Sequence, residues 1–425
     1  MKVILKAPIF TQSGYGEHSR LVYDSLLEII DKIDLYIYPL EWGQTSHVSP
    51  DESNTEYYTK IQELSDKVGH VANSFQGKIP TDFFDLSIQI TIPGEFEQIA
   101  KYNVGITAGV ETDSISHTWI QKINQMNKIL TISDFSKKSI VDTIYPLQDQ
   151  NGNPAGELKV QVPVEVVHYP VKEYETEQVD NLDIQTEFNF LSISLLGVRK
   201  NIENSLSWFV EKFHDNPDVG YVIKTSRAKT SNVDFQHTSR HLKNILDKYP
   251  DRKCSVYLLH GQLSEGQLKS LFEHEKIKCF ISLAHGEGFG LSTFDAACSA
   301  MPVVATNWSG HLDYLMQYCE KKKKNKHFFH KVKVHMDKVQ PQAHWADIII
   351  PQSQWAYPIK LSYQQELEKV YKNYGVSKKR AKELKEIILK RHRKEDILKK
   401  YTDIIFEDMQ DRLNWKKVID EVEEI

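Results

Sequence analysis

The sequence predicts an α/β protein built from two domains of Rossmann type. Strand-like apolar runs alternate with helix-like segments along most of the chain, which is the pattern of parallel sheets covered by helices. The chain has 425 residues, more than one ordinary hydrophobic core usually holds. Its apolar content of 40% and aromatic content of 11% are sufficient for two buried cores.

The first half of the chain predicts one such sheet. We expect strands at residues 3–8, 34–39, 83–91, 102–109, 127–132 and 160–169, and helices at about 16–30, at 56–68 and from 133. Residues 148–157 are rich in Asn, Gly, Pro and Gln and indicate a surface hairpin. Gly14 and Gly16 end the first strand and open the first helix. This loop is either a phosphate-facing glycine loop or a tight turn alone.

The second half predicts another sheet, with strands at residues 188–195, 219–225, 255–259, 279–283 and 302–306. Arg199 and Lys200 follow the first of these strands, and Lys224 ends the second. Two cations at a strand-to-helix turn can offset charge on a departing phosphate. Ser264 and Gln267 have the spacing of a capping box.

The turn at residues 284–290 is the most informative stretch of the chain. It follows the apolar run 279–283, which indicates a buried parallel strand, and it precedes a helix-compatible segment from residue 291. Gly286, Gly288 and Gly290 let a ligand approach the main chain closely. The free N–H groups at the start of the helix favour an anion there.

Two carboxylates flank this turn, Glu287 within it and Asp295 about one helical turn into the helix. Because carboxylates repel anions, we expect these side chains to accept hydrogen bonds from hydroxyl groups. A ligand that carries both phosphate and many hydroxyls, such as a nucleotide sugar, fits this mixture. The structural alternative is a glycine-rich turn with a solvated Glu287.

The domain boundary is expected in residues 173–186, which are acidic and lack hydrophobic periodicity. We therefore expect a first domain at residues 1–172 and a second at 187–400.

Composition narrows the class of protein further. The formal net charge of −5 argues against a protein that coats nucleic acid generally. The four cysteines are scattered without metal-ligand spacing, which indicates reduced thiols and a reducing compartment. No stretch reaches the roughly 20 apolar residues of a membrane span. We expect a cytoplasmic protein, with peripheral contact to a membrane left open.

The spacing Glu287-x-Phe289-Gly290-x-x-x-x-Asp295 resembles the E-x-F-G-x-x-x-x-E signature of family-4-like retaining glycosyltransferases, with Asp in place of the second Glu. These enzymes have the GT-B fold, in which two Rossmann-like domains face each other across a cleft. The resemblance implies that a C-terminal helix, here residues 401–425, crosses back to the first domain. Arg199 and Lys200 resemble the basic pair that contacts the donor's diphosphate in this family.

The resemblance implies a metal-independent retaining glycosyltransferase without a cofactor, which moves a hexosyl or pentosyl unit from a nucleoside-diphosphate sugar. Glu287 is implied as the catalytic residue, and Glu111 and His117 are candidates on the acceptor side. The residues expected to bind the donor are Gly14, Gly16, Arg199, Lys200, Lys224, Gly288, Phe289, Gly290, Leu291 and Asp295.

Two other functions stay open at this point. One is a nucleotide-sugar epimerase of the same fold, for which Glu95, Glu111 and Asp113 would supply additional carboxylates. The other is a non-catalytic GT-B protein that binds an anionic polymer or a membrane. Its binding surface would be the basic run Lys321, Lys322, Lys323 and Lys324. The alternative interpretation of this run is a solvated insertion without a binding role. The acceptor, whether glycan, lipid, protein or nucleic acid, is also open.

Overall fold

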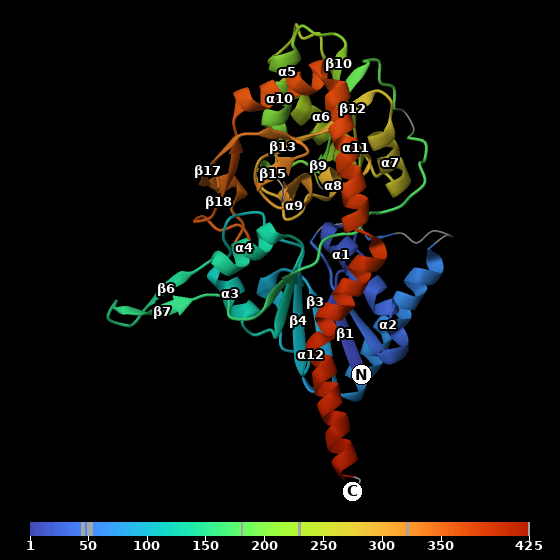
Figure 1. The fold of residues 1–425 in the computed structure, drawn as a ribbon, viewed down its shortest axis with the longest axis vertical. Coiled ribbons are helices and arrows are strands. Elements are labelled where there is room, and N and C mark those ends of the chain that lie inside the picture. The colour runs from blue at the N-terminus through green and yellow to red at the C-terminus, as the bar shows by residue number, and fades with distance from the viewer. Residues whose placement is uncertain (44–46, 49–53, 180–181, 228–230, 320–322, 424–425) are drawn as a thin grey trace.

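The computed structural model describes residues 1–43, 47–48, 54–179, 182–227, 231–319 and 323–423, with side chains as far as Met409. Two α/β domains lie one above the other, and the last two helices run down along both of them (Figure 1). This arrangement confirms the predicted fold class.

The first domain contains a six-stranded parallel sheet in the order β2-β1-β3-β4-β5-β8. Its strands are β1 Lys2–Ala7, β2 Asp34–Pro39, β3 Leu86–Ile90, β4 Tyr102–Thr107, β5 Lys128–Thr131 and β8 Val164–Val166. Its helices are α1 Gly14–Leu27, α2 Thr55–Ser74, α3 His117–Ile123 and α4 Asp134–Asp142. Every residue of β3 and β4 is buried, as expected for strands covered on both faces.

The second domain contains a six-stranded parallel sheet in the order β11-β10-β9-β12-β13-β16. Its strands are β9 Phe188–Leu195, β10 Val219–Ser226, β11 Ser255–Leu259, β12 Ile277–Ser282, β13 Val303–Thr306 and β16 His330–Val332. Its helices are α5 Ile202–Phe213, α6 Asn232–Leu246, α7 Glu265–Glu273, α8 Leu291–Cys298, α9 Leu312–Leu315 and α10 Lys360–Lys372. In this order the chain reverses direction across the sheet between β9 and β12, which is the switch point of a Rossmann fold.

Serine side chains fix the start of several helices. The oxygens of Ser13, Ser116 and Ser133 each accept a hydrogen bond from a backbone N–H three residues later, which satisfies a free donor of the first turn. Ser231 does the same for α6. The capping box predicted at Ser264 is present, with both of its hydrogen bonds.

Three antiparallel hairpins extend from the two sheets. They are β6 Tyr145–Gln148 with β7 Pro154–Leu158, β14 Met316–Cys319 with β15 Lys324–His327, and β17 Val334–Lys338 with β18 Gln354–Pro358. The β6–β7 hairpin projects from the first domain (Figure 1) and is the hairpin expected at residues 148–157. Lys324 lies in β15, whereas Lys321 and Lys322 fall outside the described residues.

The C-terminal helices α11 Tyr374–Arg391 and α12 Lys394–Glu423 connect the two domains. The buried Lys128 of β5 donates to the carbonyl of Ile404 at 3.0 Å and pairs with Asp408 at 3.0 Å. The hydroxyl of Tyr401 lies 2.8 Å from the buried ring of His18 in α1. The predicted return of a C-terminal helix to the first domain is therefore present, and the crossing helix begins at Lys394. Over the described part of the chain, no helix is both long and apolar enough to cross a membrane.

Candidate active site

A cavity of about 900 Å³ lies between the two domains. The second domain contributes residues 192–196 at the end of β9 and residues 280–283 at the end of β12. The first domain contributes the loops that follow β1, β3 and β4, including Gly14, Ile92 and residues 108–112. The cavity therefore opens at the switch point of the second sheet, where ligands of open α/β sheets usually bind.

The glycine turn predicted from the sequence forms one wall of this cavity. It joins β12 to α8, and Gly290 at the helix start has φ +85°, a conformation that favours glycine. The hydroxyl of Tyr314 donates to the carbonyls of Phe289 and Gly290, at 3.1 and 2.9 Å. These two bonds hold the turn in place through a side chain that does not itself line the cavity.

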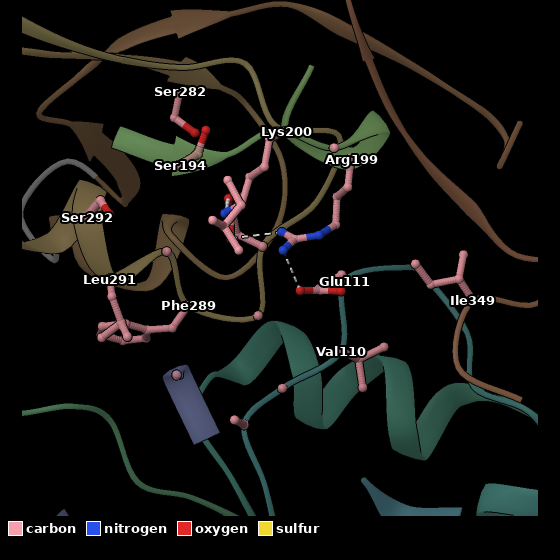
Figure 2. Close-up of a pocket in the computed structure, with 18 of the residues that line it drawn as sticks. Val110, Glu111, Ser194, Arg199, Lys200, Ser282, Phe289, Leu291, Ser292 and Ile349 are labelled. Atoms are coloured by element: carbon pink, nitrogen blue, oxygen red, sulfur yellow. Dashed lines mark hydrogen bonds and ion pairs between the residues drawn. The ribbon is translucent and has the colours of Figure 1, made fainter. Parts of the chain in front are cut away.

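Three charged side chains meet at this turn. Lys200 lies 2.5 Å from one carboxylate oxygen of Glu287, and Arg199 lies 3.1 Å from the other. Arg199 also pairs with Glu111 of the first domain at 2.9 Å. Figure 2 shows the guanidinium of Arg199 reaching towards Glu111, with Lys200 beside it. Arg199 therefore joins a carboxylate of each domain.

Burial and ion pairing shift the pKa values of Glu287 and Lys200 in opposite directions. Burial disfavours ionised Glu287, but Lys200 and Arg199 outweigh it and lower the pKa of Glu287 to about 2. Burial also lowers the pKa of Lys200, against the attraction of Glu287. At neutral pH Glu287 is a carboxylate, so it can accept hydrogen bonds or stabilise positive charge but cannot donate a proton.

The two domains touch next to these charges. The hydroxyl of Ser133 donates to the carbonyl of Gly288 at 2.6 Å. A Cβ atom added at Gly109 would lie 2.8 Å from the Cα of Gly288, and one added at Gly286 would lie 1.9 Å from the carbonyl oxygen of Glu111. Only glycines allow the two main chains to approach this closely, so the turn's glycines serve domain contact as well as the cavity.

Phe289 anchors the turn in an aromatic cluster, of which Phe289 and Tyr169 also line the cavity. Its ring lies 5.1 Å from Tyr169, 5.1 Å from Phe294 and 5.0 Å from Tyr314, measured between centroids. His392, between α11 and α12, lies 5.0 Å from Phe294. The position of the turn therefore depends on the chain crossing between the domains.

Most of the residues predicted for the site line the cavity. They are Gly14, Glu111, Arg199, Lys200, Glu287, Gly288, Phe289, Gly290 and Leu291.

Four of the predicted residues lie elsewhere. Gly16 packs against Thr11, where a Cβ would come within 2.0 Å of a carbonyl oxygen. Lys224 lies two residues before the end of β10, which is one strand away from the switch point. His117 is exposed and lies 6.1 Å from the ring of Tyr145.

Asp295 lines a second cavity of about 620 Å³, together with Lys172 and Glu265. Burial raises the pKa of Asp295 to about 7, against the attraction of Lys172. Lys172 belongs to the chain between the domains and pairs with Glu17 at 2.6 Å and with Glu265 at 3.3 Å.

Within the described part of the chain, one group of side chains has the spacing of metal ligands. Asp134, His168 and Asp313 place one ligand atom each within 4.8 Å of one another. Asp313 already accepts a hydrogen bond from the backbone N–H of Asp134 at 2.7 Å and lies 3.2 Å from His168. These contacts join the first and second domains, and none of the three residues lines the cavity at the glycine turn.

Sequence reasoning did not identify two parts of the cavity wall. One is the pair Tyr15 and Trp42 in the first domain, whose rings lie 4.3 Å apart. The other is the segment 342–349 between β17 and β18, which includes Trp345. Each part contains a tryptophan next to polar residues, Trp42 and Trp345. A tryptophan in such a loop was the feature of the sequence that could have indicated a cavity wall.

Comparison with known proteins gives a likeness of fold. No protein-family model and no curated protein matches the sequence. HepE from Anabaena, solved with UDP and glucose, has a TM-score of 0.58 at 13% identity, covering 96% of this chain and 100% of that chain. Sucrose-phosphate synthase from Thermosynechococcus elongatus has a TM-score of 0.60 at 11% identity, covering 96% and 99%.

A UDP-forming trehalose-phosphate synthase from Burkholderia xenovorans has a TM-score of 0.58 at 11% identity, covering 95% of this chain and 98% of that chain. These three glycosyltransferases share the two facing α/β domains over nearly their whole lengths. The chain described here therefore has the GT-B fold.

Proposed function

We propose that this protein is a retaining glycosyltransferase that moves a sugar from a nucleoside-diphosphate sugar to an acceptor hydroxyl. The observation that carries the proposal is the pairing of Glu287 with Arg199 and Lys200 at a glycine turn inside the interdomain cavity. The fold supports it, because HepE binds UDP and glucose on the same architecture. The second domain would hold the donor, and the first would hold the acceptor.

The donor's anionic diphosphate and its hydroxyl-bearing sugar match the two kinds of group in the cavity, two cations and a carboxylate. Arg199 and Lys200 would meet the diphosphate and stabilise it as it leaves. The backbone N–H groups of Phe289, Gly290 and Leu291 would contribute to the same anion site. Glu287, freed in part from the two cations by the incoming phosphates, would accept a hydrogen bond from a hydroxyl of the transferred sugar.

The reaction then needs no covalent link to the protein. The acceptor oxygen attacks the anomeric carbon, the bond from that carbon to the phosphate oxygen breaks, and the acceptor's proton passes to the departing phosphate. Because Glu287 is ionised, its negative charge also stabilises the positive charge that develops on the sugar ring. The acceptor enters on the face that the phosphate leaves, so the anomeric configuration is retained.

The test begins with a thermal-shift screen against nucleotide sugars, starting with UDP-glucose. The donor that stabilises the protein is then used to measure turnover of Glu287→Gln and Lys200→Met variants. We expect each variant to lose about 100-fold or more in kcat, the scale typical for removal of one transition-state contact. Lys248→Met, in the exposed turn that follows α6, is the matched control. Unchanged turnover in both site variants would refute the mechanism.

The same donor, incubated without acceptor, separates the alternatives. Isomerised or hydrolysed nucleotide sugar would favour an epimerase. Glu95 and Glu111 line the cavity and would supply the additional carboxylates of that reaction. Asp113 does not line the cavity, and its carboxylate accepts a hydrogen bond from the backbone N–H of Gln354 at 2.7 Å. A melting shift with no product from any acceptor would favour a non-catalytic binding protein.

A further inference from the structure

The half of the cavity formed by the first domain carries no basic side chain among the described residues. Its lining residues between 14 and 169 include three glutamates, Glu41, Glu95 and Glu111, and no lysine, arginine or histidine. Of these three glutamates, only Glu111 is paired with a cation among the residues that the structure describes in the second domain. A phosphorylated or carboxylated acceptor would meet net negative charge here, whereas hydroxyl groups would find acceptors.

The same half of the cavity offers aromatic faces. Tyr15 and Trp42 line it with their rings 4.3 Å apart. Trp345, which comes from the segment between β17 and β18, also lines the cavity and is 65% exposed. An indole face left open in a cavity is suited to the apolar C–H face of a ring-shaped ligand.

The backbone at Trp345 is held in place by hydrogen bonds within its own segment. It lies in residues 339–353, between β17 and β18, and exchanges backbone hydrogen bonds with Ile349 at 2.9 and 3.1 Å. Val339 and Ile349 of the same segment form a small buried core with Trp355. The backbone that carries the indole is therefore fixed before a ligand arrives.

This segment also reaches from the second domain to the first. The backbone N–H of Asp113 donates to the carbonyl of Gln354 at 3.0 Å, and the side chain of Asp113 accepts from the N–H of Gln354 at 2.7 Å. Thr118 bonds to Asp347 at 3.3 Å. Figure 2 shows Ile349 of this segment on the far side of Arg199 and Glu111 from Phe289 and Leu291. Residues 342–349 thus close the acceptor side of the cavity.

From these observations we propose that the acceptor is an uncharged saccharide, that it stacks on Trp345, and that Glu41 excludes anionic acceptors. This inference rests on the proposed glycosyltransferase function. It excludes sugar phosphates, acidic glycans and phosphate-bearing polymers as acceptors. The cavity volume of about 900 Å³ lies near the upper end of the roughly 300–1,000 Å³ found for small-molecule sites, which leaves space for a sugar beside the donor.

The first experiment compares acceptors that differ mainly in charge. Glucose, maltose and N-acetylglucosamine are tested against glucose 6-phosphate and glucuronate, and against dodecanol in micelles, with the donor found by thermal shift. We expect product from a neutral saccharide, with kcat/KM at least about tenfold above that of its charged counterpart. Preference for a charged sugar or for the alcohol would overturn the inference while leaving the transferase proposal intact. Absence of transfer to every acceptor would overturn both.

The second experiment changes the charge of the cavity wall at Glu41. Glu41→Lys is expected to raise kcat/KM for glucuronate relative to glucose by about tenfold. Glu63→Lys makes the same charge change on an exposed position of α2, outside the cavity lining, and is expected to leave this ratio unchanged. An equal shift in both variants, or none in Glu41→Lys, would contradict the role given to Glu41.

The third experiment tests stacking. Trp345→Ala is expected to raise the KM of the neutral acceptor roughly 5- to 10-fold, and Trp345→Phe is expected to recover most of the loss. Tyr318→Ala, which removes a 59% exposed ring of β14, controls for loss of surface aromatic area. An unchanged acceptor KM in Trp345→Ala, with a normal melting temperature, would refute the stacking contact.

Discussion

Glu287 is the residue at which the charges of the site meet. Its two carboxylate oxygens face Lys200 and Arg199. These two cations lower the pKa of Glu287 to about 2, so the side chain is ionised at neutral pH. A buried carboxylate without such partners would be protonated more readily. The ion pairs therefore decide which chemistry is available to this residue, and they exclude its use as a proton donor near neutral pH.

Asp295 has the opposite electrostatics. Burial raises its pKa to about 7, so the folded state prefers the protonated form. The unfolded chain ionises near pH 3.8, and between these values the folded state binds more protons. The contribution of this residue to stability therefore falls as pH rises from about 4 to 7.

We predict that Asp295→Asn is more thermostable than the parent protein at pH 8. The neutral amide avoids the buried charge, so the advantage should shrink as pH falls from 7 towards 4. Melting curves of both proteins across this range provide the measurement. A difference in melting temperature that does not vary with pH would contradict a raised pKa at this position.

At the scale of elements, α12 is bound to the first domain through polar contacts as well as apolar ones. His18 of α1 is fully buried, and burial lowers its pKa to about 3, so the ring is neutral. One ring nitrogen lies 2.8 Å from the hydroxyl of Tyr401 and the other 3.3 Å from that of Tyr169. Tyr169 in turn packs on Phe289 of the glycine turn. The crossing helix thus supports the site through two intermediate side chains.

Tyr401→Phe should destabilise the protein, because it leaves a buried imidazole nitrogen of His18 without its partner. The expected loss in the free energy of unfolding is about 1–3 kcal/mol, measured by urea denaturation. Tyr318→Phe, with an exposed hydroxyl-bearing ring, is the matched control and should change stability little. Equal stability of the two variants would show that the buried bond contributes nothing.

At the scale of the whole molecule, the two domains are held together by contacts on both sides of the cavity. Gly109 and Gly288 touch beside the glycine turn, and Asp113 bonds to Gln354 at the β17–β18 segment. The ion pair of Arg199 with Glu111 lies between these contacts. The contacts that hold the two domains together therefore lie on both sides of the charged groups of the site.

Gly109→Ala is expected to hold the domains apart. Gly109 has φ +100°, and an added Cβ would lie 2.8 Å from Gly288, so the variant suffers both backbone strain and a clash. We expect a larger radius of gyration by small-angle scattering and a kcat lowered about 10- to 100-fold, since misplacement by about 1 Å can cost 100-fold. Gly152→Ala, at φ +80° with open space around it, controls for strain alone. A radius unchanged from the parent would refute the steric contact.

Much of this arrangement follows from the sequence alone. The alternation of apolar strands with capped helices determines two parallel sheets, because each strand must be covered on both faces. Once the sheets are parallel, the loops after β9 and β12 lie at the same edge. Arg199, Lys200 and Glu287 therefore come together for a reason that is local and topological, and their meeting could be predicted.

The tertiary structure decided which neighbours of these residues face the cavity. Leu291 and Asp295 share one short helix, yet α8 packs so that Asp295 faces Lys172 and the second cavity. Lys224 lies near the end of a strand of the second domain's sheet, but that strand, β10, lies on the far side of β9 from the switch point. Trp345 reaches the cavity only because residues 339–353 cross between domains. Sequence spacing governs the backbone within one element, whereas the direction that an element faces depends on contacts between segments hundreds of residues apart.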